Sequence, residues 1–401
     1  MIDMARVSAD TPGAAHRVFL NSAGSSLPPT PVLDTVIAHL RREAEIGGYE
    51  ALDERAADLE AGYGVFAELL GCRPDQVAFT DSATRSWLAA FEAVPLTAGD
   101  RILVGELEYG GNAIPLLMRA RAVGASVEVV PSDGDGSFAP DALAAMLDER
   151  VKVVSVVQVP TNGGVVAADV RRISDAAHSV GALVLLDACQ AVGQLAVDAE
   201  ALDVDVLTGT GRKWLRGPRG TGFLVVRDRA KAVLRPKLAD LQGGTWTGAE
   251  SYALRDDARV YELWENDTAT RLGLIAAARY LLELGVEAVE EAVTRRGAHL
   301  RSALAEVDGV TVHDLGTRKC GLVTFSVDGA EAGEVQAALA ARDVAVSITR
   351  RSSTLYDMDR RGLTELVRAS PHYFVGEAQL DAAVGVVAEV AAGARGRAAR
   401  A

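Results

Sequence analysis

Residues 208–226 read TGTGRKWLRGPRGTGFLVV, a lysine-containing turn between two apolar segments. The glycines around Lys213 let a ligand approach the backbone closely. Thr208, Thr210 and Arg212 add hydroxyl and guanidinium donors of the kind that bind phosphate groups. A single lysine in a loop is usually an ordinary surface residue, but this combination favours a lysine that contacts a ligand.

Short apolar runs on both sides of this turn predict a sheet of buried strands. Their continuous Val, Ile and Leu content is typical of strands that are covered on both faces. Helical patterns such as DALAAMLDER and VRRISDAAHSVG lie between them, so we expect an α/β fold with a mostly parallel, seven-stranded sheet. The strands are expected at 76–80, 101–105, 126–130, 151–159, 182–188, 204–210 and 222–226.

Changes in the sequence pattern divide the chain into an arm and two domains. Residues 1–30 look like an irregular N-terminal arm, and residues 31–265 form the large α/β domain with the lysine turn. A long helical stretch at 268–306 then leads to alternating strand and helix patterns, which predict a smaller α+β C-terminal domain at 266–401. A chain of 401 residues is long enough for one large core and a second, smaller one.

Asp187 ends the strongly apolar segment LVLLD, 26 residues before Lys213. An aspartate buried in this way is costly without a cationic partner, and a protonated pyridine nitrogen is such a partner. The spacing allows one crossover and one further strand, so both side chains are expected at the carboxyl edge of the same sheet. The alternative for Asp187 alone is a turn or helix-cap residue.

FTDSATRSW at 79–87 predicts a strand followed by a small polar turn that opens a helix. Ser82, Ala83 and Thr84 can present backbone N–H groups and hydroxyls to an anion at that helix N-terminus. An ordinary N-cap has the same pattern, so this segment alone is weak evidence.

Together with these segments, the chain from about residue 19 to residue 377 resembles class V aminotransferase-fold enzymes. These are fold type I enzymes dependent on pyridoxal 5′-phosphate (PLP), and they include the cysteine desulfurases. The resemblance implies that Lys213 forms the Schiff base with PLP, that Asp187 pairs with the pyridine nitrogen, and that Ser82–Thr84 and Thr210 bind its phosphate. Arg212 stands where the family more often has histidine.

Other segments add residues to this resemblance. ELEYGGN places Tyr109 where the family stacks an aromatic ring on the cofactor, and LLDACQ places Gln190 near the ring oxygen. In VQVPTNGGVV either Thr161 or Asn162 would contact the ring hydroxyl. LVRASPHYF implies that Arg368 binds the substrate α-carboxylate in a bidentate pair; alone, it would be a surface salt bridge.

Two departures from the family pattern bear on the reaction. Residues 344–369, where cysteine desulfurases carry a nucleophilic cysteine, contain none, and Cys72, Cys189 and Cys320 fall in segments of structural character. Serine accepts sulfur far less readily than a thiolate, so a persulfide-type desulfurase is not expected. YELWENDTA has Trp264 where many relatives have Gly-Thr, and this resembles isopenicillin N epimerase-like enzymes, ergothioneine-type C–S lyases and PLP enzymes of lincosamide pathways.

We therefore expect a C–S lyase that carries out α,β-elimination on an S-substituted L-cysteine, with Trp264 in a substrate pocket or in the core. The alternatives are decarboxylation coupled to oxidative deamination, transamination, epimerisation, or a non-catalytic binding protein. The resemblance to antibiotic-pathway enzymes further implies a place in secondary metabolism, and a homodimer in which residues around 245–268 serve the partner's site.

Composition excludes several classes of partner. The net charge of −14 and the lack of a long basic run argue against nucleic acid. Three cysteines without a CxxC pair predict neither a disulfide framework nor a metal site. No secretory signal and no apolar run long enough to span a bilayer are expected, so the sequence favours a cytoplasmic protein with no membrane partner.

Overall fold

The computed structural model describes residues 2–134, 136–167 and 169–398. Its main sheet has seven strands in the order β2-β8-β7-β6-β5-β3-β4. Only β8 runs antiparallel to its neighbours, so the prediction of a mostly parallel, seven-stranded sheet is confirmed. The strands are β2 (Val77–Thr80), β3 (Arg101–Gly105), β4 (Ser126–Val130), β5 (Val151–Val157), β6 (Leu183–Asp187), β7 (Val206–Thr210) and β8 (Gly222–Val226).

Both faces of this sheet are buried, as continuous apolar strands require. Along β6, Val184 and Leu186 join one hydrophobic cluster, whereas Leu183 and Leu185 join a second one. Fully burying each such side chain contributes about 1.5–3 kcal/mol. Helices α3 (Gly48–Leu70), α7 (Val170–His178) and α9 (Thr268–Leu284) contribute to the first cluster, and α4 (Ala83–Glu92) and α5 (Gly110–Val123) to the second.

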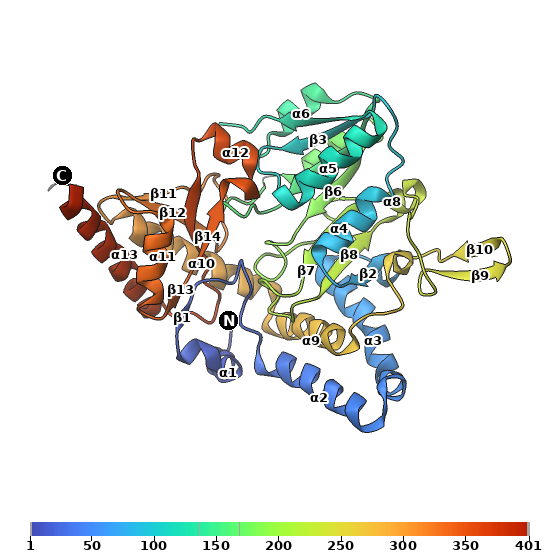
Figure 1. Cartoon of the computed structure of the whole chain (residues 1–401), viewed down its shortest axis with the longest axis horizontal. Coiled ribbons are helices and arrows are strands. Elements are labelled where there is room, and N and C mark those ends of the chain that lie inside the picture. Colours follow the sequence, from blue (N-terminus) through green and yellow to red (C-terminus); the bar gives the residue numbers. More distant parts are fainter. Residues whose placement is uncertain (1, 135, 168, 399–401) are drawn as a thin grey trace.

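The C-terminal part has its own antiparallel sheet with the strand order β11-β12-β15-β14. Its strands are β11 (Val310–Val312), β12 (Val323–Val327), β14 (Ser347–Arg350) and β15 (Glu365–Ala369). Figure 1 shows this smaller α+β part, orange to red, beside the main sheet with helices α10 (Val286–Ala305), α11 (Ala332–Ala340), α12 (Leu355–Arg360) and α13 (Glu377–Ala398). No helix in the described ranges is both long and apolar enough to cross a membrane.

Short elements complete the chain between these parts. Three further helices are α2 (Thr30–Ile46), α6 (Pro140–Met146) and α8 (Asp228–Val233). Single 3₁₀ turns lie at Pro12–Ala15, Pro74–Gln76, Ala258–Tyr261 and Arg351–Ser353.

The N-terminal arm is irregular only in part. The arm contains α1 (Met4–Asp10) and β1 (Val18–Phe19), and β1 pairs in parallel with β13 (Val344–Ala345) of the C-terminal part. Its backbone hydrogen bonds come from a strand more than 300 residues away, so the local pattern gave no sign of them.

The helical stretch expected at 268–306 is two helices. Gly285 ends α9 and precedes α10 with a φ of 84°. Glycine adopts this left-handed region at no steric cost, and the chain therefore turns there and does not continue as one helix.

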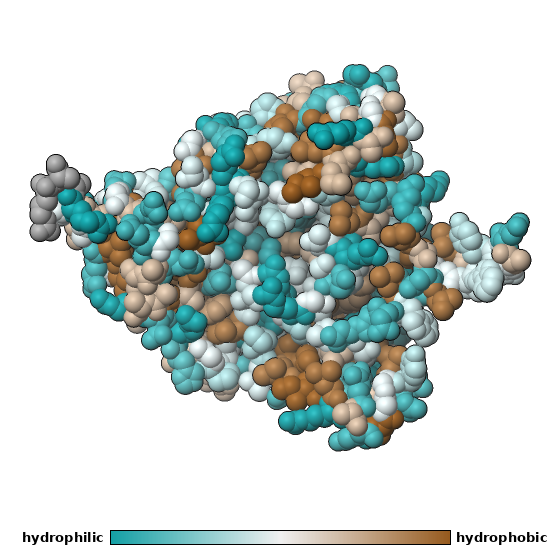
Figure 2. Space-filling model, in the orientation of Figure 1, coloured by the Kyte–Doolittle hydropathy of each residue, from teal (hydrophilic) through white to brown (hydrophobic). Residues whose placement is uncertain are grey.

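A hairpin that the sequence did not predict projects from the main body (Figure 1). It consists of β9 (Gly244–Gly248) and β10 (Ser251–Leu254), and its Trp246 and Tyr252 are 76% and 73% exposed. Apolar surface lies where the hairpin leaves the body (Figure 2). Large exposed aromatic side chains on a protruding element are typical of an interaction surface.

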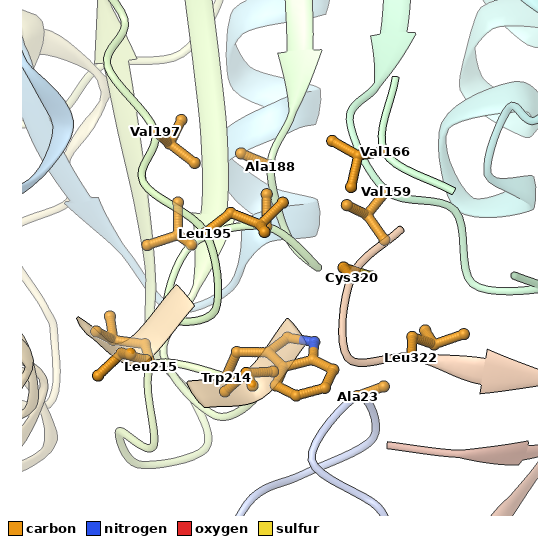
Figure 3. Close-up of a cluster of buried hydrophobic side chains, with 14 of the residues drawn as sticks. Ala23, Val159, Val166, Ala188, Leu195, Val197, Trp214, Leu215, Cys320 and Leu322 are labelled. Carbon is orange, nitrogen blue, oxygen red and sulfur yellow. The ribbon is translucent and has the colours of Figure 1, made fainter. Parts of the chain in front are cut away.

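A dense hydrophobic cluster packs against the lysine turn. Figure 3 shows Trp214, the residue after Lys213, among Ala23, Cys320 and Leu322. Trp214 is 1% exposed, and its indole N–H donates to Oε1 of Gln190 at 2.9 Å. Because Trp214 is held on all sides, the position of the neighbouring Lys213 backbone is fixed as well.

Candidate active site

The carboxyl ends of β2, β3, β5, β6 and β7 meet at one edge of the main sheet, where an open α/β sheet places its ligand. A cavity with an empty volume of about 560 Å³ lies there. Its walls are formed by Ser82, Ala83, Thr84, Tyr109, Val157, Val159, Thr161, Asp187, Cys189, Gln190, Thr210, Arg212 and Lys213. Most of the residues singled out in the sequence therefore converge on one cavity, although they are spread over more than 130 positions.

Lys213 lies in the turn after β7 and faces this cavity. Burial lowers the pKa of its ammonium group, and the positive charges of Arg212 and Arg368 lower it further. Asp187 and Cys189 act in the opposite direction. The net effect increases the fraction of neutral amine, which is the form that attacks a carbonyl carbon.

Asp187 ends β6 and is 6% exposed. Its Oδ1 accepts the backbone N–H of Cys189 at 2.9 Å, and its Oδ2 accepts the side-chain amide of Asn112 at 2.9 Å. Neither bond is to a cationic side chain, and among the described residues no arginine or lysine forms a salt bridge with this carboxylate. A buried carboxylate that lacks a cationic partner and faces a cavity is suited to a ligand cation such as a pyridinium N–H.

Another part of the cavity wall is suited to an anion. Helix α4 begins there, and its N-cap Ser82 accepts the N–H of Arg85 at 3.2 Å. Thr210 and Arg212 lie beside this helix start, and the Arg212 guanidinium also donates to the carbonyl of Gly24. Burial and the nearby Arg219 lower the pKa of Arg212, which a bound dianion would reverse.

Tyr109 is the N-cap residue of α5 and is 41% exposed. Gly111 leaves room for its ring, since a Cβ at position 111 would lie 2.5 Å from Cε1 of Tyr109. The side chain is thereby free to lie against a flat ligand in the cavity.

Of the two alternatives after β5, the structure places Thr161 on the cavity wall. Asn162 does not line the cavity: it is 1% exposed, and its amide donates to Asp357 of α12 at 2.7 Å. The two residues lie in a turn after β5, and only Thr161 lines the cavity. Asn162 therefore links this segment to α12 and does not itself line the cavity.

Arg368 lies just outside the cavity wall, on β15. Its guanidinium donates to Oγ1 of Thr161 and, at 3.0 Å, to Oγ of Ser347. Burial lowers the pKa of Arg368 to about 10, and the charge of Arg212 lowers it as well. The side chain thus remains a cation at neutral pH, held by neutral partners beside the cavity.

Gln190 lines the cavity but its side chain is largely engaged. Its amide donates to the carbonyl of Ala23 at 3.1 Å, and its carbonyl accepts the indole N–H of Trp214. Trp264 lies neither in this cavity nor in the core: it is 55% exposed on the surface. This exposure contradicts the alternative of a core position for Trp264, and its place in a substrate pocket stays a prediction.

Sequence reasoning missed three polar residues near the site: Cys189, Asn112 and Glu108. Cys189 was interpreted as structural, although it lies only two positions after Asp187 and its side chain faces the cavity. Asn112 and Glu108 belong to the same ELEYGGN segment as Tyr109. The i, i+4 spacing of Glu108 and Asn112 was the available signal, because such pairs share one side of a helical turn.

Comparison with known proteins agrees with this architecture. A family model described as "Aminotransferase class-V" matches residues 18–382. The chain belongs to the class V aminotransferase family. Enzymes of this family depend on PLP, so this chain is a PLP-dependent enzyme, and the fold, family and cofactor predictions are confirmed. The donors and acceptors around the cavity fit this cofactor: a buried carboxylate, Asp187, suits a protonated ring nitrogen, the start of α4 and Arg212 suit a phosphate, and the amine of Lys213 suits an aldehyde.

Relatives within the class V aminotransferase family resemble the chain over most of its length. A "Probable cysteine desulfurase 2" of Mycobacterium leprae is 32% identical over 86% of this chain and 87% of its own. A "Probable hercynylcysteine sulfoxide lyase" of Mycobacterium tuberculosis is 31% identical over 94% of this chain and 91% of its own. The apo structure of a cysteine desulfurase from Thermococcus onnurineus superposes with a TM-score of 0.90 at 22% identity, covering 98% and 99% of the two chains.

The function expected from the sequence was wrong where it preferred an S-substituted cysteine lyase and excluded a persulfide-type desulfurase. Relatives named cysteine desulfurases match the chain at 30% identity or more over most of its length. The expectation rested on the lack of a cysteine at residues 344–369, but the thiol that accepts the sulfur need not belong to that segment. The role in secondary metabolism and the cytoplasmic location stay predictions.

Proposed function

We propose that the protein is a cysteine desulfurase that removes the sulfur of L-cysteine and leaves L-alanine. The observation that carries the proposal is the convergence of Lys213 and Asp187 on one cavity, with Arg368 at its edge. The names of the relatives support cysteine as the substrate class.

PLP, when bound, draws electrons away from the α-carbon of the amino acid so that the bond to sulfur on the next carbon can break. Lys213 would hold the cofactor and, once released by the substrate, move a proton at the α-carbon. Asp187 would hold the proton on the ring nitrogen. Tyr109 would cover one face of the ring and exclude water from it.

Arg368 would bind the substrate carboxylate. Thr161 and Ser347 orient its guanidinium from two sides, and neither of them carries a competing negative charge. A carboxylate that enters the cavity can therefore form the bidentate pair that arginine favours, and this pair fixes the orientation of the α-carbon relative to Lys213.

The sulfur needs an acceptor. Burial raises the pKa of the Cys189 thiol well above its ordinary value, and the charge of Asp187 adds to this effect. A protonated thiol is a poor nucleophile, so we propose that the acceptor is a thiol from outside the chain. The balanced reaction is L-cysteine plus RSH giving L-alanine plus RSSH. The carbon–sulfur bond breaks and a carbon–hydrogen bond replaces it, so the β-carbon is reduced by two electrons, while the new S–S bond oxidises the two sulfur atoms by the same two electrons.

The test is the product formed from L-cysteine by the PLP-loaded protein with an added thiol. The proposal expects L-alanine and sulfane sulfur in equal amounts, and Lys213→Ala as the inactive control. Pyruvate and ammonia in place of alanine would contradict it. Cys189→Ala should still transfer sulfur to the added thiol, whereas loss of transfer with PLP still bound would move the acceptor role to Cys189.

We also propose that the protein is a homodimer and that its residues around 245–268 serve the partner's site. A continuous exposed surface supports this: the groove beside the hairpin includes Leu241, Trp246 and Tyr252, and the backbone N–H of Trp264 donates to Asp240 next to it at 2.9 Å. Exposed aromatic and aliphatic side chains of this size favour burial against another protein surface.

A further inference from the structure

The side-chain amide of Asn112 lies between two buried carboxyl groups. Its Nδ2 donates to Oε1 of Glu108 at 3.0 Å and to Oδ2 of Asp187 at 2.9 Å. Glu108, Asn112 and Asp187 are only 2%, 5% and 6% exposed. The three side chains therefore form one buried chain that ends on the carboxylate facing the cavity.

Glu108 determines which way this amide points. An amide nitrogen has two hydrogens, and here each one is donated to a different carboxyl oxygen. If the amide were turned over, its carbonyl oxygen would face both carboxyl groups and both hydrogen bonds would be lost. Oε1 of Glu108 also accepts the backbone N–H of Tyr109 at 2.8 Å, so the same atom holds the start of α5.

We propose that Glu108 is a positioning residue for the cofactor: through Asn112 it orients Asp187, and through the backbone N–H of Tyr109 it fixes the stacking residue. The inference rests on the proposed role of Asp187 at the ring nitrogen and not on the identity of the substrate.

The electrostatics of Glu108 agree with a role that depends on its acceptor oxygen. Burial raises the pKa of Glu108 to about 7, and the charge of Asp187 raises it further, while the hydroxyl of Ser155 and the N–H donors of Asn112 and Tyr109 oppose this. Only Oε1 accepts the hydrogen bonds from Asn112 and Tyr109. A proton on Oε2 therefore leaves the positioning bonds in place.

The test compares two variants of Glu108 by the affinity of the apoprotein for PLP. Glu108→Leu removes the acceptor and should weaken PLP binding by about tenfold to about a hundredfold, as expected for the loss of a hydrogen bond that orients a charged group. Glu108→Gln keeps a carbonyl oxygen at Oε1 and should retain wild-type affinity. The visible absorbance band of bound PLP should shift in the leucine variant and not in the glutamine variant.

Asn112→Ala tests the same path and serves if Glu108→Leu does not fold. It should weaken PLP binding as Glu108→Leu does. The double variant should bind PLP as tightly as the single variant with the lower affinity, because both substitutions break the same connection. Glu106→Gln is the control from the same turn, since Glu106 pairs with Arg360 at 2.9 Å and does not contact Asp187.

Three outcomes would overturn the inference: wild-type affinity in Glu108→Leu, equal losses in the glutamine and leucine variants, or additive losses in the double variant. Asp187→Asn tests separately the proposed role of Asp187 at the ring nitrogen, on which this inference rests. If Asp187→Asn binds PLP normally, the role of Asp187 at the ring nitrogen is wrong. If Asp187→Asn loses PLP but Glu108→Leu does not, only the inference about Glu108 is wrong.

Discussion

Burial has different consequences for the two cations beside the cavity. It lowers the pKa of Lys213, whose neutral amine is the reactive form, and it lowers the pKa of Arg368 to about 10, which still leaves that group charged at neutral pH. The same physical effect thus prepares one residue for covalent chemistry and leaves the other as a fixed positive charge.

Arg368→Ala should lower kcat/KM for L-cysteine by about a hundredfold or more, because a desolvated charge pair with the substrate carboxylate is lost. The absorbance of bound PLP should be unchanged. Arg350→Ala is the matched control, since its side chain is 65% exposed on the neighbouring strand. Equal kinetics for the two variants would remove Arg368 from the site.

Glu108 should make the apoprotein less stable as pH rises. Its pKa is raised from 4.5 to about 7 in the folded state. The folded state therefore binds this proton more tightly, and the stabilisation present below pH 4.5 is lost between pH 4.5 and about 7. The loss amounts to about 3 kcal/mol. Urea unfolding of the wild type and Glu108→Gln across this range should differ in slope, and parallel curves would contradict the raised pKa.

At the scale of elements, the turn after β7 is fixed by a buried arginine. Arg216 is 1% exposed and donates to the carbonyl of Leu27 at 2.8 Å, to the hydroxyl of Tyr373 at 2.7 Å and to that of Thr11 at 2.7 Å. It thereby joins the lysine turn to the N-terminal arm and to the segment after β15.

Arg216→Met should lower the free energy of unfolding by about 3 kcal/mol or more, because three buried polar groups lose their partner. Urea denaturation measures this, with the exposed Arg219→Ala as the control from the same turn. A loss for Arg216→Met as small as that of the control would show that the turn is held by other contacts.

The sequence predicted those elements whose burial pattern is local. All seven strands of the main sheet were expected, because strands covered on both faces are apolar throughout. The hairpin at 244–254 was missed because its side chains are exposed and give no such pattern. At the site, Lys213, Asp187 and Thr210 were placed from motifs, whereas choosing Thr161 over Asn162, and recognising Cys189, required knowing which side chain faces the cavity.

At the scale of the whole molecule, one surface is rich in exposed large apolar side chains. The hairpin and the segment before it expose Trp246, Tyr252, Leu238 and Leu241 by 70–76% each. Burial of this surface against a second copy would stabilise both subunits and bring Trp264 toward the partner.

Trp246→Glu combined with Tyr252→Glu should dissociate the proposed dimer, because two charges would have to be buried in the interface. Light scattering should give twice the 42.0 kDa of one chain for the wild type and a single chain for the double variant. A wild-type monomer would remove the shared-site proposal. An unchanged melting temperature of the monomeric variant at low protein concentration would show that the subunit fold itself is intact.

The most direct test of the account is to locate the cofactor on the chain. Borohydride reduction of the PLP-loaded protein, followed by proteolysis and mass spectrometry of the peptides, identifies the lysine that carries PLP. We predict that the pyridoxyl group is found on Lys213, within the turn at 208–226. A pyridoxyl group on another lysine, with Lys213 unmodified, would contradict the assignment of this cavity as the active site.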